Sequence, residues 1–315
     1  MHNNKFRAML VTETENKEFK REITTRHIDD LPEGDVIINV KYSSLNYKDA
    51  LSAIGNKGVT RNYPHTPGID AAGIVVQSNN DNLKVGAEVL VTGYGLGMST
   101  SGGYGEYIRV PAQWVVELPS TLSLRESMIY GTAGFTAALS VYKLVNSGVK
   151  TSDGDILVTG STGGVGSMAI SILSKIGYNV TAATGKASEK DMLLGIGAKN
   201  IIDRNEIDDT SGKALLKNRW AGVIDTVGGN ILATAIKTTN YGGSVTCCGN
   251  VASDEFKTSV YPFILKGISV LGIDSVKCPM DIRLQIWSKL SLDWKITDLY
   301  TNVNEVSLEG LNKEI

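Results

Sequence analysis

The sequence predicts an α/β protein built from two parts of different character. Up to about residue 128, short runs rich in Val and Ile end at Gly, Pro, Asn or Asp, which is typical of β-strands joined by irregular loops. From residue 155 onward, strand-like runs alternate with apolar residues at helical spacing, which predicts a parallel sheet with crossover helices. The length of 315 residues agrees with two domains, since a domain usually has about 100–200 residues.

The first part contains four segments with the composition of β-strands. Each is rich in Val and Ile or alternates apolar with polar residues, and each is bounded by turn-forming residues. The predicted strands are 36–46, 72–78, 87–93 and 104–110.

The second part begins with a buried strand at 155–160. Apolar residues in 165–176 then repeat on one face of a helix that Gly177 ends. A second helix is predicted from Ser188, as its N-cap, to near Gly197. Further strands are predicted at 178–184, 199–203, 222–228, 243–249 and 268–274.

Composition limits the classes of function. Hydrophobic residues make up 42% and charged residues 20%, which is enough apolar side chain for a core and too little charge for disorder. The net charge is −2 with both signs mixed, so neither a nucleic-acid nor a membrane partner is expected. The three cysteines form no metal-binding spacing, and no signal-peptide pattern opens the chain. These features predict a reduced, metal-free, cytoplasmic protein.

The clearest motif is LVTGSTGGVGSM at 157–168, which lies between a predicted strand and a predicted helix. At such a junction, backbone amides and the helix dipole can hold a pyrophosphate. The spacing is that of G-x-G-x-x-G, with Ser161 in the place of the first glycine, followed by Gly163 and Gly166. The context therefore predicts a dinucleotide site on a Rossmann sheet, and a plain turn is the alternative.

Two other phosphate-binding motifs fit less well. A P-loop needs a Lys-Ser/Thr pair after the glycines, and none follows here. Thr159, Gly160, Gly164 and Gly166 also match the T-G-x-x-x-G-x-G of short-chain dehydrogenases. Those proteins carry the motif near the N-terminus and need a Tyr-x-x-x-Lys pair, which this sequence lacks.

The next strand indicates which cofactor binds. An NAD site has an acidic residue about 20 positions on, which binds the ribose hydroxyl. Here Thr184, Gly185 and Lys186 stand at that place, and Ser188 and Arg204 can complete a pocket for a 2′-phosphate. We therefore expect NADPH, with Lys186 as a merely solvated charge as the alternative.

Several longer segments resemble the medium-chain dehydrogenase/reductase superfamily. They are similar to its zinc-free branch, named after quinone oxidoreductases, and within that branch to the acryloyl-CoA reductase group. The matching segments are SSLNYKDALSAIG (43–55), YPHTPGIDAAG (63–73), MIYGTAGFTA (128–137), VTGSTGGVGS (158–167), AGVIDTVGG (221–229), NYGGSVTCCG (240–249) and GIDSV (272–276).

The resemblance implies a Rossmann domain inserted into a GroES-like β-rich domain. The expected boundaries are 129–271 for the Rossmann domain, and 1–128 plus 272–315 for the GroES-like catalytic domain. Family members usually end with a helix and a strand that contains a Gly-Arg pair, whereas this sequence ends at LEGLNKEI, before such a strand. The family commonly forms homodimers, and the strand at 268–274 is the expected contact.

The resemblance also places the chemistry. Zinc-dependent relatives have a metal-binding cysteine at the position of Asn46, so the carbonyl of the substrate must here be polarised by hydrogen bonds. Tyr47 is the expected catalytic group beside the nicotinamide, with Asn46 as an orienting amide and packing alone as the alternative for Tyr47. Lys48 and Asp49 are expected to pair. Lys57 and Arg61 are candidates for the phosphates of CoA.

The expected function is zinc-independent, NADPH-dependent hydride transfer to an activated C=C bond, with acryloyl-CoA as the leading substrate. The alternatives are an NADPH:quinone oxidoreductase and, in another class, a non-catalytic NADPH-binding redox sensor. The expected cofactor-binding residues are Tyr47, Ser161, Thr162, Gly163, Gly164, Val165, Gly166, Ser167, Thr184, Gly185, Lys186, Ser188, Arg204, Val251, Ile264 and Ser275.

Overall fold

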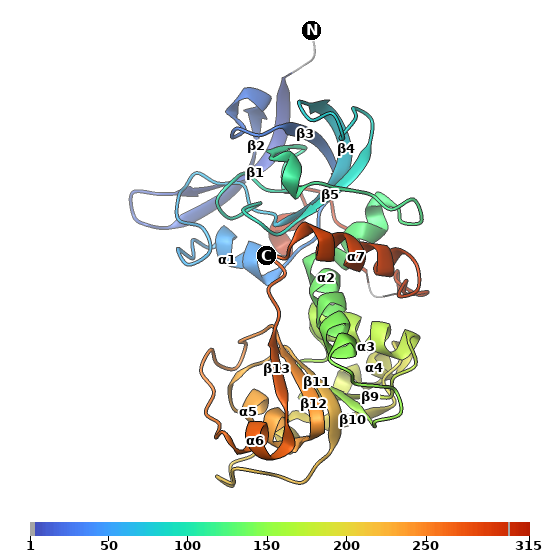
Figure 1. Ribbon diagram of the computed structural model, residues 1–315. Coiled ribbons are helices and arrows are strands. Elements are labelled where there is room, and N and C mark those ends of the chain that lie inside the picture. The colour runs from blue at the N-terminus through green and yellow to red at the C-terminus, as the bar shows by residue number, and fades with distance from the viewer. Residues whose placement is uncertain (1–3, 302) are drawn as a thin grey trace. The chain divides into compact units, whose positions relative to one another are not determined.

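The computed structural model describes residues 4–301 and 303–315 and divides into two compact units (Figure 1). The first unit is the chain up to Thr132 together with Val276–Ser291 and Thr297–Ile315. The second unit is Ala133–Ser275 with Leu292–Ile296. The chain first passes from one unit to the other within helix α2 (Leu124–Asn146).

The first unit is mainly antiparallel β-structure. A two-stranded hairpin accompanies a five-stranded sheet of order β6-β3-β4-β5-β7. Its strands are β1 (Lys5–Glu13), β2 (Phe19–His27), β3 (Val36–Tyr42), β4 (Asp70–Ser78), β5 (Glu88–Thr92), β6 (Tyr107–Val110) and β7 (Val116–Glu117). The four predicted strands are β3 to β6 and are confirmed. The hairpin was not predicted because β2 is rich in polar and charged residues, which hide its period of two.

The helices of the first unit are α1 (Tyr47–Ala53), α7 (Met280–Ser291) and the beginning of α2. Helix α2 is kinked at Gly131, whose φ of 48° and ψ of −155° are not helical. A side chain at Gly131 would place its Cβ 2.3 Å from Ser44 Oγ. Glycine is therefore required at the kink by both its conformation and its surroundings.

The second unit holds a six-stranded parallel sheet of order β10-β9-β8-β11-β12-β13. The strands are β8 (Ile156–Val158), β9 (Val180–Thr184), β10 (Asn200–Asp203), β11 (Trp220–Asp225), β12 (Thr239–Cys247) and β13 (Ser269–Gly272). Counted from β8, the order is 3-2-1-4-5-6, the doubly wound arrangement that binds dinucleotides where the strand order reverses. The expected Rossmann sheet is confirmed.

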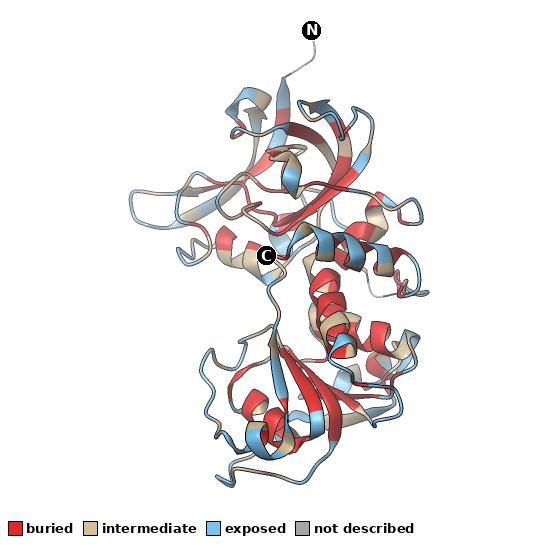
Figure 2. Cartoon of the chain, in the orientation of Figure 1, coloured by how far each residue is buried: buried red, intermediate tan, exposed pale blue. Residues whose placement is uncertain are grey.

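Helices connect the strands of this sheet and cover its apolar core. They are α3 (Gly164–Lys175), α4 (Lys190–Gly195), α5 (Gly229–Thr238) and α6 (Tyr261–Lys266). Figure 2 shows that buried residues are concentrated in the central strands. Leu157, Val223 and Val245 pack with Leu232 and Ile236 of α5 in one cluster.

One helix start differs from its prediction. Ser188 does not cap α4, because it lies inside a 3-10 turn at Ala187–Glu189 that precedes the helix. Its hydroxyl is 3.4 Å from Glu189 Oε1 instead of bonding to a backbone amide of α4. The spacing from Ser188 to Asp191 matched a capping pattern, and the extra turn shifts the helix start to Lys190.

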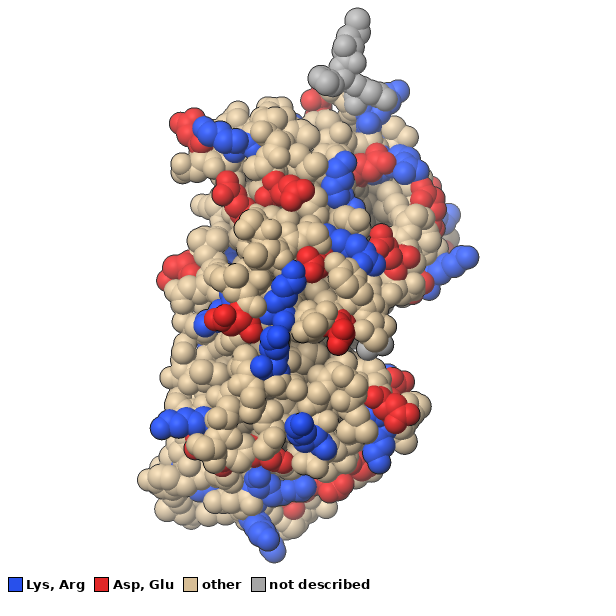
Figure 3. Space-filling view, turned by 90° about the vertical axis from the view of Figure 1, so that its right-hand side faces the viewer, with Lys and Arg blue, Asp and Glu red and all other residues tan. Residues whose placement is uncertain are grey.

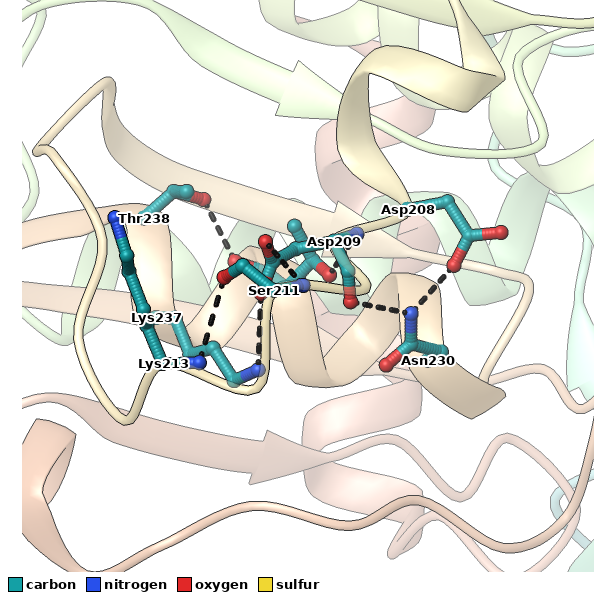
Figure 4. Close-up of polar contacts among 8 residues, drawn as sticks. Asp208, Asp209, Ser211, Lys213, Asn230, Lys237 and Thr238 are labelled. Atoms are coloured by element: carbon teal, nitrogen blue, oxygen red, sulfur yellow. Dashed lines mark hydrogen bonds and ion pairs between the residues drawn. The ribbon is translucent and has the colours of Figure 1, made fainter.

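The segment before β11 is held by polar contacts and not by regular structure (Figure 4). Asn230 Nδ2 donates to Asp208 Oδ1 at 2.6 Å and to the carbonyl of Asp209 at 2.9 Å. Lys237 Nζ pairs with Asp209 Oδ2 at 3.3 Å, and both side chains are largely buried. Lys266 Nζ donates to the carbonyls of Leu216, Lys237 and Thr239. These contacts tie the segment to α5 and α6.

Charge is mixed on the surface. Lys and Arg are interspersed with Asp and Glu on the face drawn in Figure 3. Within residues 4–301 and 303–315, no helix is long and apolar enough to cross a membrane.

Candidate active site

The glycine-rich turn lies between β8 and α3, as expected. Ser161 is buried, and its hydroxyl donates to the carbonyl of Val158 at 2.8 Å, so this side chain stabilises the turn by a hydrogen bond to the end of β8. No side chain caps α3 at Gly163. Within the described chain, the amides of the first helical residues, 164–166, donate to no protein acceptor. A helix that begins in this way offers amide donors and its positive dipole end to an anion.

Two glycines of the turn have separate tasks. A Cβ on Gly166 would lie 2.4 Å from the carbonyl oxygen of Gly160, so only glycine lets α3 pack this closely on the turn. A Cβ on Gly163 would meet only that same oxygen, at 3.3 Å, which leaves the other side of Gly163 open. The turn therefore fits a pyrophosphate that approaches the backbone closely.

The end of β9 brings the expected 2′-phosphate residues together. Thr184 Oγ1 accepts the amide of Lys186 at 3.0 Å. The guanidinium of Arg204 lies over Gly185, where a Cβ would be 2.7 Å from Arg204 Nε. Neither Lys186 nor Arg204 forms an ion pair with any residue that the structure describes. Two cations without a carboxylate partner suit a phosphate better than a free ribose hydroxyl.

Three expected cofactor residues lie away from this turn in the sequence. Val251 follows β12 and is 85% exposed, and Ile264 lies on α6 with 67% of its surface exposed. Ser275 is partly exposed at the last position of the main segment of the second unit. Their role in binding a cofactor stays a prediction.

Sequence analysis missed Asp225, the last residue of β11. Its carboxylate is fully buried and accepts Thr159 Oγ1 at 2.7 Å and the amide of Gly228 at 2.8 Å. Its carbonyl accepts the amide of Cys248 at 3.1 Å. Asp225 thereby joins the ends of β8, β11 and β12, and burial raises its pKa. An acidic residue at the end of an apolar strand run, before Gly228 and Gly229, was the available signal.

In the first unit, the neighbouring residues Asn46 and Tyr47 differ in exposure and in hydrogen bonding. Tyr47 is the first residue of α1 and is 78% exposed. Asn46 precedes the helix, and its side-chain Nδ2 donates inward to Asp70 Oδ2 at 2.8 Å and to Asp49 Oδ2 at 3.3 Å. The side-chain amide NH2 group of Asn46 thus already donates to two protein carboxyl groups, whereas the Tyr47 side chain is exposed and its hydroxyl is open to a ligand.

The expected Lys48–Asp49 pair is wrong. Asp49 is fully buried, and its Oδ1 accepts the amides of Gly68 at 3.1 Å and Ile69 at 2.8 Å. Its Oδ2 accepts the amide of Asn46 at 2.9 Å. Burial and the nearby charge of Asp70 raise the pKa of Asp49 to about 7, against the opposing hydrogen bonds from Asn46 and Ile69.

The two basic candidates for CoA phosphates differ. Lys57 Nζ pairs with Glu13 Oε2 at 2.5 Å and lies over the rings of Phe19, at 5.3 Å, and Tyr63, at 4.8 Å. This lysine is therefore already engaged within the first unit. Arg61 is exposed and forms no ion pair with the described residues.

Across the part of the chain that the structure describes, no group of three or more His, Cys, Asp or Glu side chains is placed to hold a metal ion. At the position of the zinc-binding cysteine of relatives, the side-chain amide nitrogen of Asn46 donates to the carboxyl groups of Asp49 and Asp70. A hydrogen-bonded network of one side-chain amide and two carboxyl groups therefore occupies this place.

Comparison with known proteins identifies the family. Residues 32–120 match the alcohol dehydrogenase GroES-like domain, and residues 164–290 match the zinc-binding dehydrogenase domain. YhfP of Bacillus subtilis, which carries a quinone oxidoreductase name, is 49% identical over 91% of this chain and 87% of its own length. The chain belongs to the zinc-free group of the medium-chain dehydrogenase/reductase superfamily.

Other members of the family agree with this assignment. The acrylyl-CoA reductase AcuI of Ruegeria pomeroyi is 39% identical over 97% of this chain and 93% of its own length. The structure of the YhdH oxidoreductase of Salmonella enterica, solved in complex with NADP, has a TM-score of 0.95 and 40% identity, covering 98% of this chain and 94% of the other. The structure of YhfP with NAD bound has a TM-score of 0.96 and 46% identity, with the same coverage.

The raised pKa of Asp49 predicts that stability depends on pH. The pKa of the Asp49 carboxyl is about 3.8 in the unfolded chain and about 7 in the folded one, so the folded state binds the carboxyl proton more tightly. The stabilisation that this proton gives to the folded state is therefore complete below about pH 3.8 and is lost as pH rises through about 7. The difference between these two pKa values corresponds to about 4 kcal/mol. Urea unfolding of the wild type should show the free energy of unfolding falling across this window, and Asp49→Asn should remove most of that slope. Parallel pH profiles for the two proteins would contradict the raised pKa.

Proposed function

We propose that this chain is a zinc-independent, NADPH-dependent reductase of an activated C=C bond, with acryloyl-CoA as the leading substrate. The observation that supports NADPH as the cofactor is made at the end of β9. Lys186 and Arg204 lie there and form no ion pair with a carboxylate among the described residues. The substrate class is supported by the acrylyl-CoA reductase name of the relative from Ruegeria pomeroyi.

The second unit would hold the nucleotide. The open amides at the start of α3 would bind the pyrophosphate, and Gly163 would allow it to approach the backbone. Lys186 and Arg204, with the hydroxyls of Thr184 and Ser188, would bind the 2′-phosphate. When bound, NADPH supplies the hydride for the reduction.

The first unit would contribute the groups that act on the substrate. Negative charge develops on the thioester oxygen during reduction, and a hydrogen-bond donor placed there lowers the barrier. The hydroxyl of Tyr47 is the exposed donor at the start of α1. Asn46 would orient this turn, since its side-chain amide nitrogen donates to Asp49 and Asp70.

Quinone reduction is the second candidate function. It is supported by the quinone oxidoreductase name of YhfP from Bacillus subtilis, the relative with 49% identity. A quinone needs no cationic groups for CoA phosphates, and Lys57 is engaged with Glu13 in this chain.

The first test is consumption of NADPH by the purified protein, with acryloyl-CoA and a naphthoquinone assayed in parallel. We expect turnover with acryloyl-CoA and a fall in kcat of about 100-fold or more for Tyr47→Phe, with the KM for NADPH nearly unchanged. Turnover with the quinone alone would favour the second candidate. Tight NADPH binding without any turnover would favour a redox sensor and would contradict both enzymatic functions.

Cofactor preference tests the cationic end of β9. Lys186→Glu should weaken NADPH binding about 10- to 100-fold, because it replaces a charge-assisted contact with a repulsive charge, and should change NADH binding much less. The matched control is Lys199→Glu, which makes the same charge change just before β10, at the amino ends of the parallel strands, whereas Lys186 follows the carboxyl end of β9. Equal losses for NADPH and NADH would contradict the assignment.

We also propose that the chain is a cytoplasmic homodimer. Strand β13 is an edge of the six-stranded sheet, and an exposed edge invites pairing with another strand. Large apolar side chains are exposed on β13, on α6 and at the residue that precedes α6. They are Val260, Tyr261, Ile264, Leu265 and Val270.

Sedimentation velocity tests the dimer. The wild type should sediment as a dimer at micromolar concentration, and Ile264→Asp combined with Val270→Lys should shift it to monomer, because charges on the apolar surface would have to be buried. Val85→Asp introduces a charge at an exposed valine of the first unit and should leave the dimer intact. A monomeric wild type would remove the proposal.

A further inference from the structure

Asp70 connects two helices of the first unit through a single buried carboxylate. It is the first residue of β4 and is fully buried. Its Oδ2 accepts Ser44 Oγ at 2.5 Å and Asn46 Nδ2 at 2.8 Å, both from the segment that leads into α1. The same oxygen accepts the amide of Thr132 at 2.7 Å, and Oδ1 accepts Thr132 Oγ1 at 2.6 Å.

The contact with Thr132 falls where α2 is interrupted. Gly131 leaves helical geometry, and the amide of Thr132, which begins the helical segment after the kink, is the one that donates to Asp70. A carboxylate at that position caps the segment and interacts favourably with its dipole. A Cβ at Gly131 would lie 2.8 Å from Asp70 Oδ2 and 2.3 Å from Ser44 Oγ, so the kink leaves no room for another side chain.

The cluster is held by neutral donors. Asn46 Nδ2 lies between Asp70 Oδ2 and Asp49 Oδ2, and no Lys or Arg pairs with either carboxylate in the described residues. The buried hydroxyl of Tyr104 donates to the carbonyl of Ser44 at 3.3 Å, at the edge of the cluster. Buried charges held only by dipoles tolerate little movement, because each lost hydrogen bond leaves an unsatisfied carboxylate.

We propose that Asp70 is a positioning residue for the reaction, which holds the first turn of α1, and with it Tyr47, against the kink of α2. In this arrangement the side-chain amide nitrogen of Asn46 links the carboxyl groups of Asp49 and Asp70, and it is not directed to the substrate. Loss of the carboxylate charge would free the turn while Tyr47 itself stays unchanged. The kinetic part of this inference rests on the proposed function, whereas the structural part does not.

The kinetic test compares Asp70→Asn with variants that change one contact each. In Asp70→Asn, an amide of the same shape presents N–H groups where donors already point, and kcat should fall about 10- to 100-fold, as for a small misplacement of a reacting group. The dissociation constant for NADPH should change less than about twofold, since all its expected contacts except Tyr47 lie in the second unit. Thr132→Val should lower kcat less, and Thr132→Ser, which restores the hydroxyl, should recover it. Asp35→Asn removes the charge of an aspartate that accepts the Ala112 amide and touches neither helix, and serves as the control.

Hydrogen exchange of the wild type and the same variants gives a readout independent of turnover. Asp70→Asn should speed amide exchange in α1 and in the first turn after Gly131 together, and Asp35→Asn should change neither. Unchanged exchange in α1, or an unchanged kcat in a folded Asp70→Asn protein, would overturn the proposal. If the wild type turns over no substrate, the proposed function fails, and the exchange data alone decide whether Asp70 holds the two helices.

Discussion

The close approach of α3 to the turn after β8 is the constraint on which the second unit depends. Gly166 permits it, because any Cβ there would collide with the carbonyl of Gly160. Among the described residues, the first amides of α3 have no protein acceptor. A helix start with unsatisfied donors is costly unless water or a ligand satisfies them, and this agrees with the proposal that the nucleotide binds at this edge of the sheet.

Asp225 links three neighbouring strand ends at that edge of the sheet by hydrogen bonds. Thr159 comes from the end of β8, Asp225 from the end of β11 and Cys248 from the end of β12, and all three are joined by hydrogen bonds at Asp225. A buried carboxylate satisfied by hydroxyl and amide donors rigidifies its surroundings. The three loops that border the candidate nucleotide site are therefore held together before any ligand arrives, which agrees with binding sites being largely preformed.

Buried carboxyl groups satisfied by neutral hydrogen-bond donors also occur in the first unit, beside the candidate catalytic residue Tyr47. Asp49 and Asp70 are buried without a cationic partner in the described chain, and backbone amides, hydroxyls and the Asn46 amide satisfy them. Membership of the zinc-free group explains why this network is of interest, because zinc-dependent relatives have a metal ligand at the position of Asn46. In this chain a bridging amide takes that place, and the polar group left open at the start of α1 is the Tyr47 hydroxyl.

The amino-acid sequence by itself determined the parallel sheet, the glycine-rich turn and the cationic residues after β9, because strand periodicity, glycine spacing and the residue type at a strand end are local signals. It also carried the family resemblance in its motifs. Only the tertiary structure decided that Arg204 lies over Gly185, that Lys57 pairs with Glu13, and that Asp49 accepts the amide of Gly68. Each of these depends on residues brought together from separate segments, and burial, which assigns Asp49 and Asp225 their roles, is a property of the packed chain and not of any stretch of sequence.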